Sequence, residues 1–280
     1  MKSRRQFLKI TGAGLAAAGI SSAIELKGSS YLPYPVGADK FTLGIAGYTF
    51  REFTIDGAIA IMKRVVVTNL SLKDFHMPMN STEEQIKAII GRFREAGINV
   101  YTVGVVYMTD EAAVDQAFEY AKMAGVQMIV GAPDIKVLPY VEKKVKKYDF
   151  RVAIHNHGPD NPLFPNPTDI WNHIKDMDPR MGICIDIGHT VRDGADPSVD
   201  IERYATRIFD MHIKDVDKAS KEGKTVEMGR GIINIPAVIA SIRKIGYSGR
   251  CSLEFEKDMK DPLAGIAESI GYWKGVMACG

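Results

Sequence analysis

Residues 181–190 read Met-Gly-Ile-Cys-Ile-Asp-Ile-Gly-His-Thr, an apolar strand-like run that ends at Asp186. Three more apolar runs end in the same way, at His155, His212 and Glu254. Side chains at the carboxyl ends of parallel strands meet on one rim of a barrel, where active sites of such barrels lie. The pattern therefore predicts one polar site assembled from four strands.

Outward from this stretch, short apolar runs alternate with amphipathic stretches. The strand-like runs are 41–46, 68–72, 99–106, 127–131, 151–154, 181–185, 208–213 and 250–255. The helical patterns are 55–66, 82–96, 111–124, 135–148, 168–177, 199–206, 235–245 and 262–277. Thr82 at a helix start and Gly97, Gly125 and Gly246 at helix ends support the division. Eight strand–helix units predict an α/β fold, a single-domain (β/α)8 TIM barrel, and no GxGxxG motif follows the first strand.

Composition and charge narrow the choice of partners. The chain has 280 residues, 46% hydrophobic and 25% charged, which is typical of a globular domain. With 36 basic and 34 acidic side chains, it has no electrostatic bias toward nucleic acid. Cys184 and Cys251 lie inside apolar runs and are interpreted as small buried residues. We expect a small-molecule ligand and no nucleic acid.

The first residues have a different character. Arg4 and Arg5 precede Phe7 and Leu8, and the uncharged, mostly apolar stretch 10–24 follows. This looks like a twin-arginine export signal, and the stretch is shorter than the ~20 residues that a stable membrane span needs. We expect a periplasmic protein without a stable membrane span, with residues 1–40 as export signal and linker and 41–280 as the catalytic barrel.

The histidines gather at strand ends. Five of the six lie at or just past a predicted strand: His76, His155, His157, His189 and His212. Asp186, His212 and Glu254 combine ligand types that suit a divalent cation, and buried acids are costly unless they are paired or metal-bound. The sequence thus predicts one divalent metal ion (Mn, Mg, Zn or Co).

Five segments carry a resemblance to a known family. IHNHG (154–158), CIDIGHT (184–190), DMHIKD (210–215), GRGIIN (229–234) and SLEFE (252–256) resemble the xylose isomerase-like barrels, which include sugar isomerases, epimerases and inosose dehydratases. The resemblance implies metal ligands at His155, Asp186, His212 and Glu254, and a substrate contact at His189. The family has glutamate at the first of these positions, so this chain keeps only Glu254 of the two glutamates that carry protons in the epimerases.

The remaining rim residues complete the expected site. A metal that chelates a carbonyl and its neighbouring hydroxyl acidifies the C–H bond between them, and Glu254 is the expected base. The other candidates are His155 and Lys73 for catalysis, and Lys214, His157, His76, Tyr48 and Arg230 for substrate binding. A salt bridge between Lys73 and Asp74, with His76 in a surface turn, is an equally good interpretation of these residues. Tyr48 and Phe50 fit either sugar stacking or packing, and Arg230 belongs to a polar connection, 215–231, expected over the barrel mouth.

The sequence is compatible with three functions. The leading one is a divalent-metal-dependent isomerase or epimerase that acts on a keto sugar or sugar derivative through a metal-stabilised enediolate. The second is a lyase or hydrolase of 3-keto-glycosides, or a dehydratase. Such an enzyme would form the same enediolate with a single base, which fits the replacement of a family glutamate by His155. The third is a periplasmic carbohydrate-binding barrel without catalysis. A homo-oligomer is left open, since barrels of this family often pair through their helices.

Overall fold

The computed structural model describes residues 39–279, so nearly all of the expected export segment lies outside the described residues. Eight parallel strands close in the order β1-β10-β7-β6-β5-β4-β3-β2. They are β1 Thr42–Ala46, β2 Asn69–Leu72, β3 Asn99–Met108, β4 Met128–Pro133, β5 Arg151–His155, β6 Met181–Asp186, β7 Ile208–Ile213 and β10 Arg250–Leu253. Pairing of Leu43 with Cys251 and of Ile45 with Leu70 closes the ring at β1. The predicted (β/α)8 TIM barrel is confirmed.

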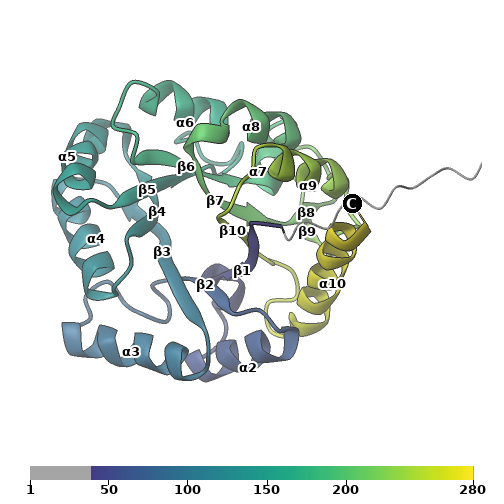
Figure 1. Ribbon diagram of the computed structural model, residues 1–280, viewed down its shortest axis with the longest axis horizontal. Helices are drawn as coiled ribbons and strands as arrows, with labels where there is room; N and C mark the ends of the chain where they lie inside the picture. The colour runs from purple at the N-terminus through teal and green to yellow at the C-terminus, as the bar shows by residue number, and fades with distance from the viewer. Residues whose placement is uncertain (1–38, 280) are drawn as a thin grey trace, which may run out of the picture. The chain divides into compact units, whose positions relative to one another are not determined.

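Helices surround the strands on the outside (Figure 1). They are α2 Ile55–Val65, α3 Glu83–Glu95, α4 Glu111–Met123, α5 Leu138–Tyr148, α6 Pro167–Ile174, α7 Ile187–Arg192, α8 Pro197–Arg203, α9 Ile235–Lys244 and α10 Leu263–Cys279. Short 3-10 turns, Gly47–Phe50, Ile135–Val137 and Ala205–Arg207, complete the connections. Among the described helices, none is long and apolar enough to cross a membrane.

Local sequence explains where these helices begin and end. Thr82 caps α3 in a reciprocal pair of hydrogen bonds with Gln85, which satisfies two backbone donors of the first turn. Gly97, Gly125 and Gly246 follow helix ends with φ of +78°, +73° and +64°, a region that glycine enters without steric cost. The predicted helix boundaries at these four positions are confirmed.

The interior of the barrel changes character along its axis. Val130, Ala153 and Cys184 form a small buried apolar cluster with Val105 and Ala132. Alternation along a strand places Ala153 and Cys184 on the same face as His155 and Asp186, two residues further along. The same alternation places Asp210 and Ser252, which both bond the Tyr101 hydroxyl, two residues before His212 and Glu254. The middle of the barrel is therefore apolar along β3 to β6 and polar along β7 and β10, and polar groups occupy its carboxyl-terminal rim.

The structure differs from the sequence-based expectation in several details. Strands β3 and β4 run to Met108 and Pro133, each two residues beyond the predicted end. Helix α7 follows β6 directly, because Asp186 caps it, and its six residues are too few to show a helical period. The polar connection after β7 contains a small antiparallel pair, β8 Asp215–Val216 and β9 Thr225–Val226, where a loop was expected.

Candidate functional site

Four strands bring four potential metal ligands together at the carboxyl-terminal rim. His155 ends β5, Asp186 ends β6, His212 lies in β7 and Glu254 follows β10. All four side chains are buried, and one ligand atom from each lies within 4.8 Å of the others. The closest pair is His155 Nε2 and His212 Nδ1, 3.0 Å apart. His155 Nε2 is 3.6 Å from an Asp186 oxygen, and His212 Nδ1 is 3.5 Å from a Glu254 oxygen.

Backbone contacts fix Asp186. Asn156 accepts a hydrogen bond from the Asp186 N–H (2.8 Å) and donates to the Asp186 carbonyl (3.2 Å), which joins β5 to β6 beside the site. The Asp186 carboxylate accepts the His189 N–H through Oδ1 (2.8 Å) as the cap of α7. The second oxygen, Oδ2, is fully buried, where it lies 3.6 Å from His155 Nε2 and 3.1 Å from the Lys214 ammonium. One oxygen thus caps α7, and the other faces the candidate ligand His155.

Glu254 is fixed by the first connection of the barrel. The Thr49 hydroxyl donates to the Leu253 carbonyl (3.2 Å) and accepts from the Phe255 N–H (3.0 Å), so it brackets the residue between them. Both bonds are buried and join segments more than 200 positions apart in sequence. The Glu254 backbone is therefore held on both sides by the connection that follows β1.

Lys214 inserts an ammonium group among the acids. Its Nζ donates to Glu254 Oε2 (2.7 Å) and Glu256 Oε1 (2.5 Å), and it lies 3.1 Å from Asp186 Oδ2. A Cβ at position 188 would collide with the Lys214 stem, so Gly188 opens the path that this side chain takes. Three carboxylates and one ammonium leave a formal charge of −2 when the imidazoles are neutral.

These charges determine the ionisation of the acids. Burial opposes the charge on Asp186 and Glu254, but the Lys214 ammonium outweighs it and holds the pKa of both carboxyls well below their usual values. Burial also opposes the charge on Lys214, yet Asp186 and Glu254 hold its pKa well above the usual value. Both acids are therefore carboxylates at neutral pH, the form that binds metal.

The residues fit a divalent cation. Buried Asp186 Oδ2 faces His155 and the Lys214 ammonium without a directed hydrogen bond from the described residues, and the two imidazole nitrogens face each other across 3.0 Å. Zinc–nitrogen bonds measure about 2.0–2.1 Å, so two imidazoles on one ion stand roughly 3 Å apart. A divalent cation would also cancel the formal charge of −2 left by the acids around Lys214. Two imidazoles and two carboxylates suit zinc, manganese or cobalt, and the set thus forms a candidate metal site.

A pocket of about 370 Å³ opens onto this site from the rim. Its lining includes His155 and Glu254 at the buried end and three aromatic rings toward solvent. The lining residues are Tyr48, Lys73, Phe75, Val105, Tyr107, His155, His157, His189, Glu254 and Glu256. The volume lies within the range of small-ligand sites.

Two of the predicted substrate-binding histidines form one wall of this pocket. Burial is the main cause that lowers the pKa of both His157 and His189 to about 3. A neutral imidazole donates one hydrogen bond and accepts another, as sugar hydroxyls require. His189 Nδ1 contacts Arg192 (3.1 Å) and His157 Nε2 contacts Tyr107 (3.4 Å), so both rings have partners that orient them.

Other predicted residues divide between the pocket and its surroundings. Lys73 lines the pocket, and it also pairs with Asp74 (2.8 Å) and donates to the Val105 carbonyl (2.8 Å), so the salt bridge with Asp74 forms at the pocket itself and a catalytic role for Lys73 stays a prediction. Tyr48 also lines the pocket, whereas Phe50 belongs to the hydrophobic core. Tyr48 is therefore placed to stack against a ligand, whereas Phe50 packs in the core.

Two predicted residues lie away from the pocket. The structure buries His76, where its Nε2 contacts the Phe53 carbonyl (2.8 Å) instead of the pocket. Arg230 is exposed and pairs with Glu268 on α10 (2.5 and 2.7 Å). A loop side chain can point several ways, and the partner on α10 cannot be found from local sequence.

Besides the apolar Val105, sequence reasoning missed three lining residues, Phe75, Tyr107 and Glu256. Glu256 follows Glu254 by two positions, a spacing that repeats a strand face. Tyr107 lies one residue past the predicted end of its strand, and Phe75 lies between Lys73 and His76, both of which were singled out. Proximity to a strand end was thus a usable signal for all three.

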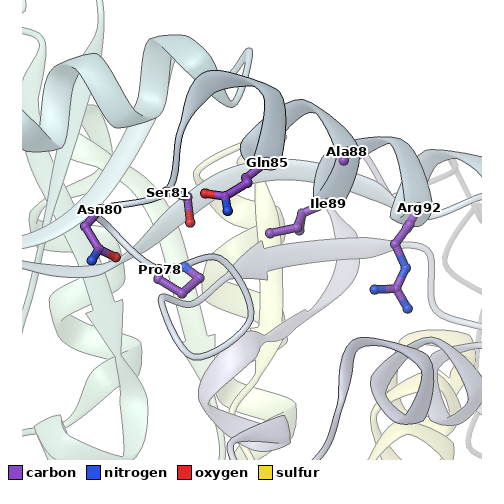
Figure 2. Close-up of a pocket in the computed structure, with 7 residues that line it drawn as sticks. All are labelled: Pro78, Asn80, Ser81, Gln85, Ala88, Ile89 and Arg92. Atoms are coloured by element: carbon purple, nitrogen blue, oxygen red, sulfur yellow. The ribbon is translucent and has the colours of Figure 1, made fainter.

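A second hollow lies outside the barrel, with a volume of about 590 Å³ (Figure 2). Its lining residues come from α3 and the segment before it: Pro78, Asn80, Ser81, Gln85, Ala88, Ile89 and Arg92. None of the predicted site residues lines it. The chemistry-bearing side chains gather at the rim pocket instead.

Comparison with known proteins places the chain among similar barrels. Residues 64–276 match the family model described as xylose isomerase-like TIM barrel. The rhizopine catabolism protein MocC of Rhizobium meliloti is 32% identical over 131 residues, 41% of this chain and 40% of that protein. The inosose dehydratase of Lacticaseibacillus casei is 25% identical over 130 residues, 41% of this chain and 43% of that protein.

Among solved structures, L-ribulose 3-epimerase superposes with a TM-score of 0.67 at 15% identity. The match covers 85% of this chain and 94% of that chain, and it shows a shared fold. The chain spans only about two fifths of the length of the two curated relatives it matches.

Proposed function

Because the chain belongs to the xylose isomerase-like TIM barrel family, we propose that it is a divalent-metal-dependent enzyme that enolises a keto sugar or a sugar derivative. The observation that carries this proposal is the convergence of His155, Asp186, His212 and Glu254 at the end of the rim pocket. A bound cation, zinc, manganese or cobalt from the donor set, would polarise a substrate carbonyl as a Lewis acid.

The residues of the chain would move the proton. Glu254 takes it from the carbon beside the carbonyl, and the bonding electrons pass to the carbonyl oxygen. Lys214 donates to Glu254 Oε2, which orients the carboxylate, and Oε1 lies 3.5 Å from His212 Nδ1. His157 and His189 hold substrate hydroxyls. Return of the proton to the same or a neighbouring carbon gives isomerisation or epimerisation.

A second outcome, loss of a leaving group, is favoured by one observation. The acids that line the pocket, Glu254 and Glu256, both follow β10, and the lining residues from the other strands include His157, Tyr107 and Lys73 but no carboxylate. An elimination needs one base and a hydrogen-bond donor for the departing oxygen, which this arrangement supplies. The similarity to an inosose dehydratase supports the same outcome.

Solvent exchange tests the proposal. Metal-loaded protein in deuterium oxide is incubated with keto sugars, inososes and 3-keto-glycosides, and NMR follows C–H exchange and product formation. We expect exchange beside the carbonyl that falls by about 10²-fold or more in Glu254→Gln. Glu202→Gln, an exposed acid paired with Lys244, is the control. Absence of exchange from all three substrate classes would leave the binding protein as the surviving alternative.

We also propose that the chain is exported by the twin-arginine route to the periplasm. The support is the pair Arg4-Arg5 before an uncharged apolar stretch in the sequence. Replacement of both arginines by lysine should retain the protein in the cytoplasmic fraction of a bacterial host. Unchanged periplasmic recovery of this variant would refute the route.

A further inference from the structure

Two aromatic side chains are exposed beside the candidate metal site. Phe75 is 46% and Tyr107 is 56% exposed, although both line the pocket that leads to His155 and Glu254. The latter two are only 2% and 6% exposed. Burial therefore decreases from the candidate metal site toward the aromatic mouth of the pocket, which gives the pocket a polar inner end and an apolar outer end.

The outer end is held in place by neighbouring side chains. The Tyr48 and Phe75 rings lie 5.7 Å apart between centroids, and the Arg51 guanidinium stacks 5.0 Å from the Tyr48 ring. Lys73 Nζ lies 5.3 Å from the Phe75 centroid and 5.9 Å from that of Tyr107. We call Tyr48, Phe75 and Tyr107 the aromatic wall.

An exposed aromatic wall continuous with a polar pocket matches one kind of ligand. A sugar or aryl ring offers an apolar face for stacking, and aromatic rings gain affinity from such contacts at low entropy cost. A single sugar ring placed at His155 and Glu254 would occupy the inner end and leave the wall in water. A second ring attached to the first would cover it.

We propose that the substrate is a glycoside whose reacting ring lies at the candidate metal site and whose second ring stacks on the aromatic wall. This inference rests on the proposed function for the position of the reacting ring. The second ring is a sugar or an aryl group, because both present a flat apolar face. The wall would then select two-ring substrates over free monosaccharides.

Binding of unreactive glycosides tests the inference. Metal-loaded protein is titrated calorimetrically with methyl glucoside and methyl galactoside, with the phenyl glycosides, and with two disaccharides locked as methyl glycosides, methyl cellobioside and methyl lactoside. We expect the two-ring ligands to bind roughly two- to tenfold more tightly than the methyl glycosides. Phe75→Ala and Tyr107→Ala should remove this preference. Tyr272→Ala, an exposed aromatic on α10, should leave it unchanged.

The outcomes separate the two proposals. None of these ligands has a carbonyl to enolise, so their binding is independent of catalysis. A preference for two-ring ligands without solvent exchange on the keto substrates would support the aromatic wall as a ring-binding surface and refute the proposed enzymatic activity. Preference for phenyl glycosides alone indicates an aryl second ring, and preference for the disaccharides indicates a sugar. Equal affinity for one and two rings, no binding at all, or a change of oligomeric state in Phe75→Ala instead of a loss of affinity would overturn the inference.

Discussion

Lys214 Nζ lies 2.7 Å from Glu254 Oε2 at the base of the rim pocket, with both groups buried. The same ammonium is 3.1 Å from Asp186, so one cation serves two carboxylates that also belong to the candidate metal site. A buried ammonium there balances part of the negative charge, and a divalent ion would balance the rest. Lys214 and a divalent ion at the candidate site would thus neutralise the same group of carboxylates.

Removal of the lysine should make the protein depend on metal. Lys214→Met leaves Asp186 and Glu254 buried without their cation, and breaking a buried pair costs about 3–5 kcal/mol. We expect a large fall in the urea midpoint of the metal-free variant, partly restored by excess Zn²⁺ or Mn²⁺. Lys244→Met, which breaks an exposed pair with Glu202, is the control and should change the midpoint little. A metal-free Lys214→Met as stable as wild type would contradict the charge balance.

Metal content should depend on each of the four predicted ligands. Because loss of even an outer contact costs roughly 10- to 100-fold in metal affinity, loss of a ligand in His155→Ala or Glu254→Gln should cost at least about 100-fold. Elemental analysis of the purified variants measures this directly. Glu268→Gln, which changes only the exposed pair with Arg230, should retain wild-type metal. Full metal content in His155→Ala would remove His155 from the ligand set.

Asp215 organises the connection that borders the rim. Its carboxylate accepts the backbone N–H groups of Val216, Gly229, Gly231 and Ile233, at 2.9 to 3.1 Å. Asp215→Ala leaves these donors without their acceptor, at about 1–3 kcal/mol for each that stays buried.

We therefore expect faster proteolytic cleavage within 217–231 and a lower urea midpoint in Asp215→Ala. Asp217→Ala is the matched control, because Asp217 accepts a single backbone N–H, that of Lys224. Equal cleavage rates in the two variants would show that the Asp215 contacts do not hold this segment.

The barrel and the rim residues could be predicted because both follow from strand periodicity. A strand end is marked locally by the change from apolar to polar residues, and parallel closure then brings Asp186, His212 and Glu254 together. Side chains in connections lack such a rule. His76 turns to the Phe53 carbonyl and Arg230 to Glu268 because of partners in other segments, 23 and 38 positions away.

The solvent exposure of the aromatic side chains could not be predicted from the sequence either. Phe50 and Phe75 are both aromatic residues that follow strands, yet Phe50 is fully buried and Phe75 is 46% exposed. Whether a residue of a connection faces the core or the pocket depends on the path of that connection. The sequence therefore predicted where the polar chemistry gathers, and the apolar outer end of the pocket needed the structure.

Asp178 should make the stability of the protein depend on pH. Arg180 donates to both Asp178 oxygens (2.9 Å each), and these bonds lower the pKa of the carboxyl to about 2. Because the pKa is lower in the folded than in the unfolded chain, where it is about 3.9, this contribution is complete above roughly pH 4. It is lost as the pH falls toward 2.

Asp178→Asn should therefore lower the urea midpoint at pH 7, and its difference from wild type should narrow at pH 3. Asp149→Asn is the matched control, since Asp149 pairs with the same Arg180 (2.8 Å) but its side chain is 87% exposed and solvent screens the pair. We expect a much smaller change in this control at either pH. A gap between Asp178→Asn and wild type that stays constant from pH 7 to 3 would assign the loss to packing instead of charge.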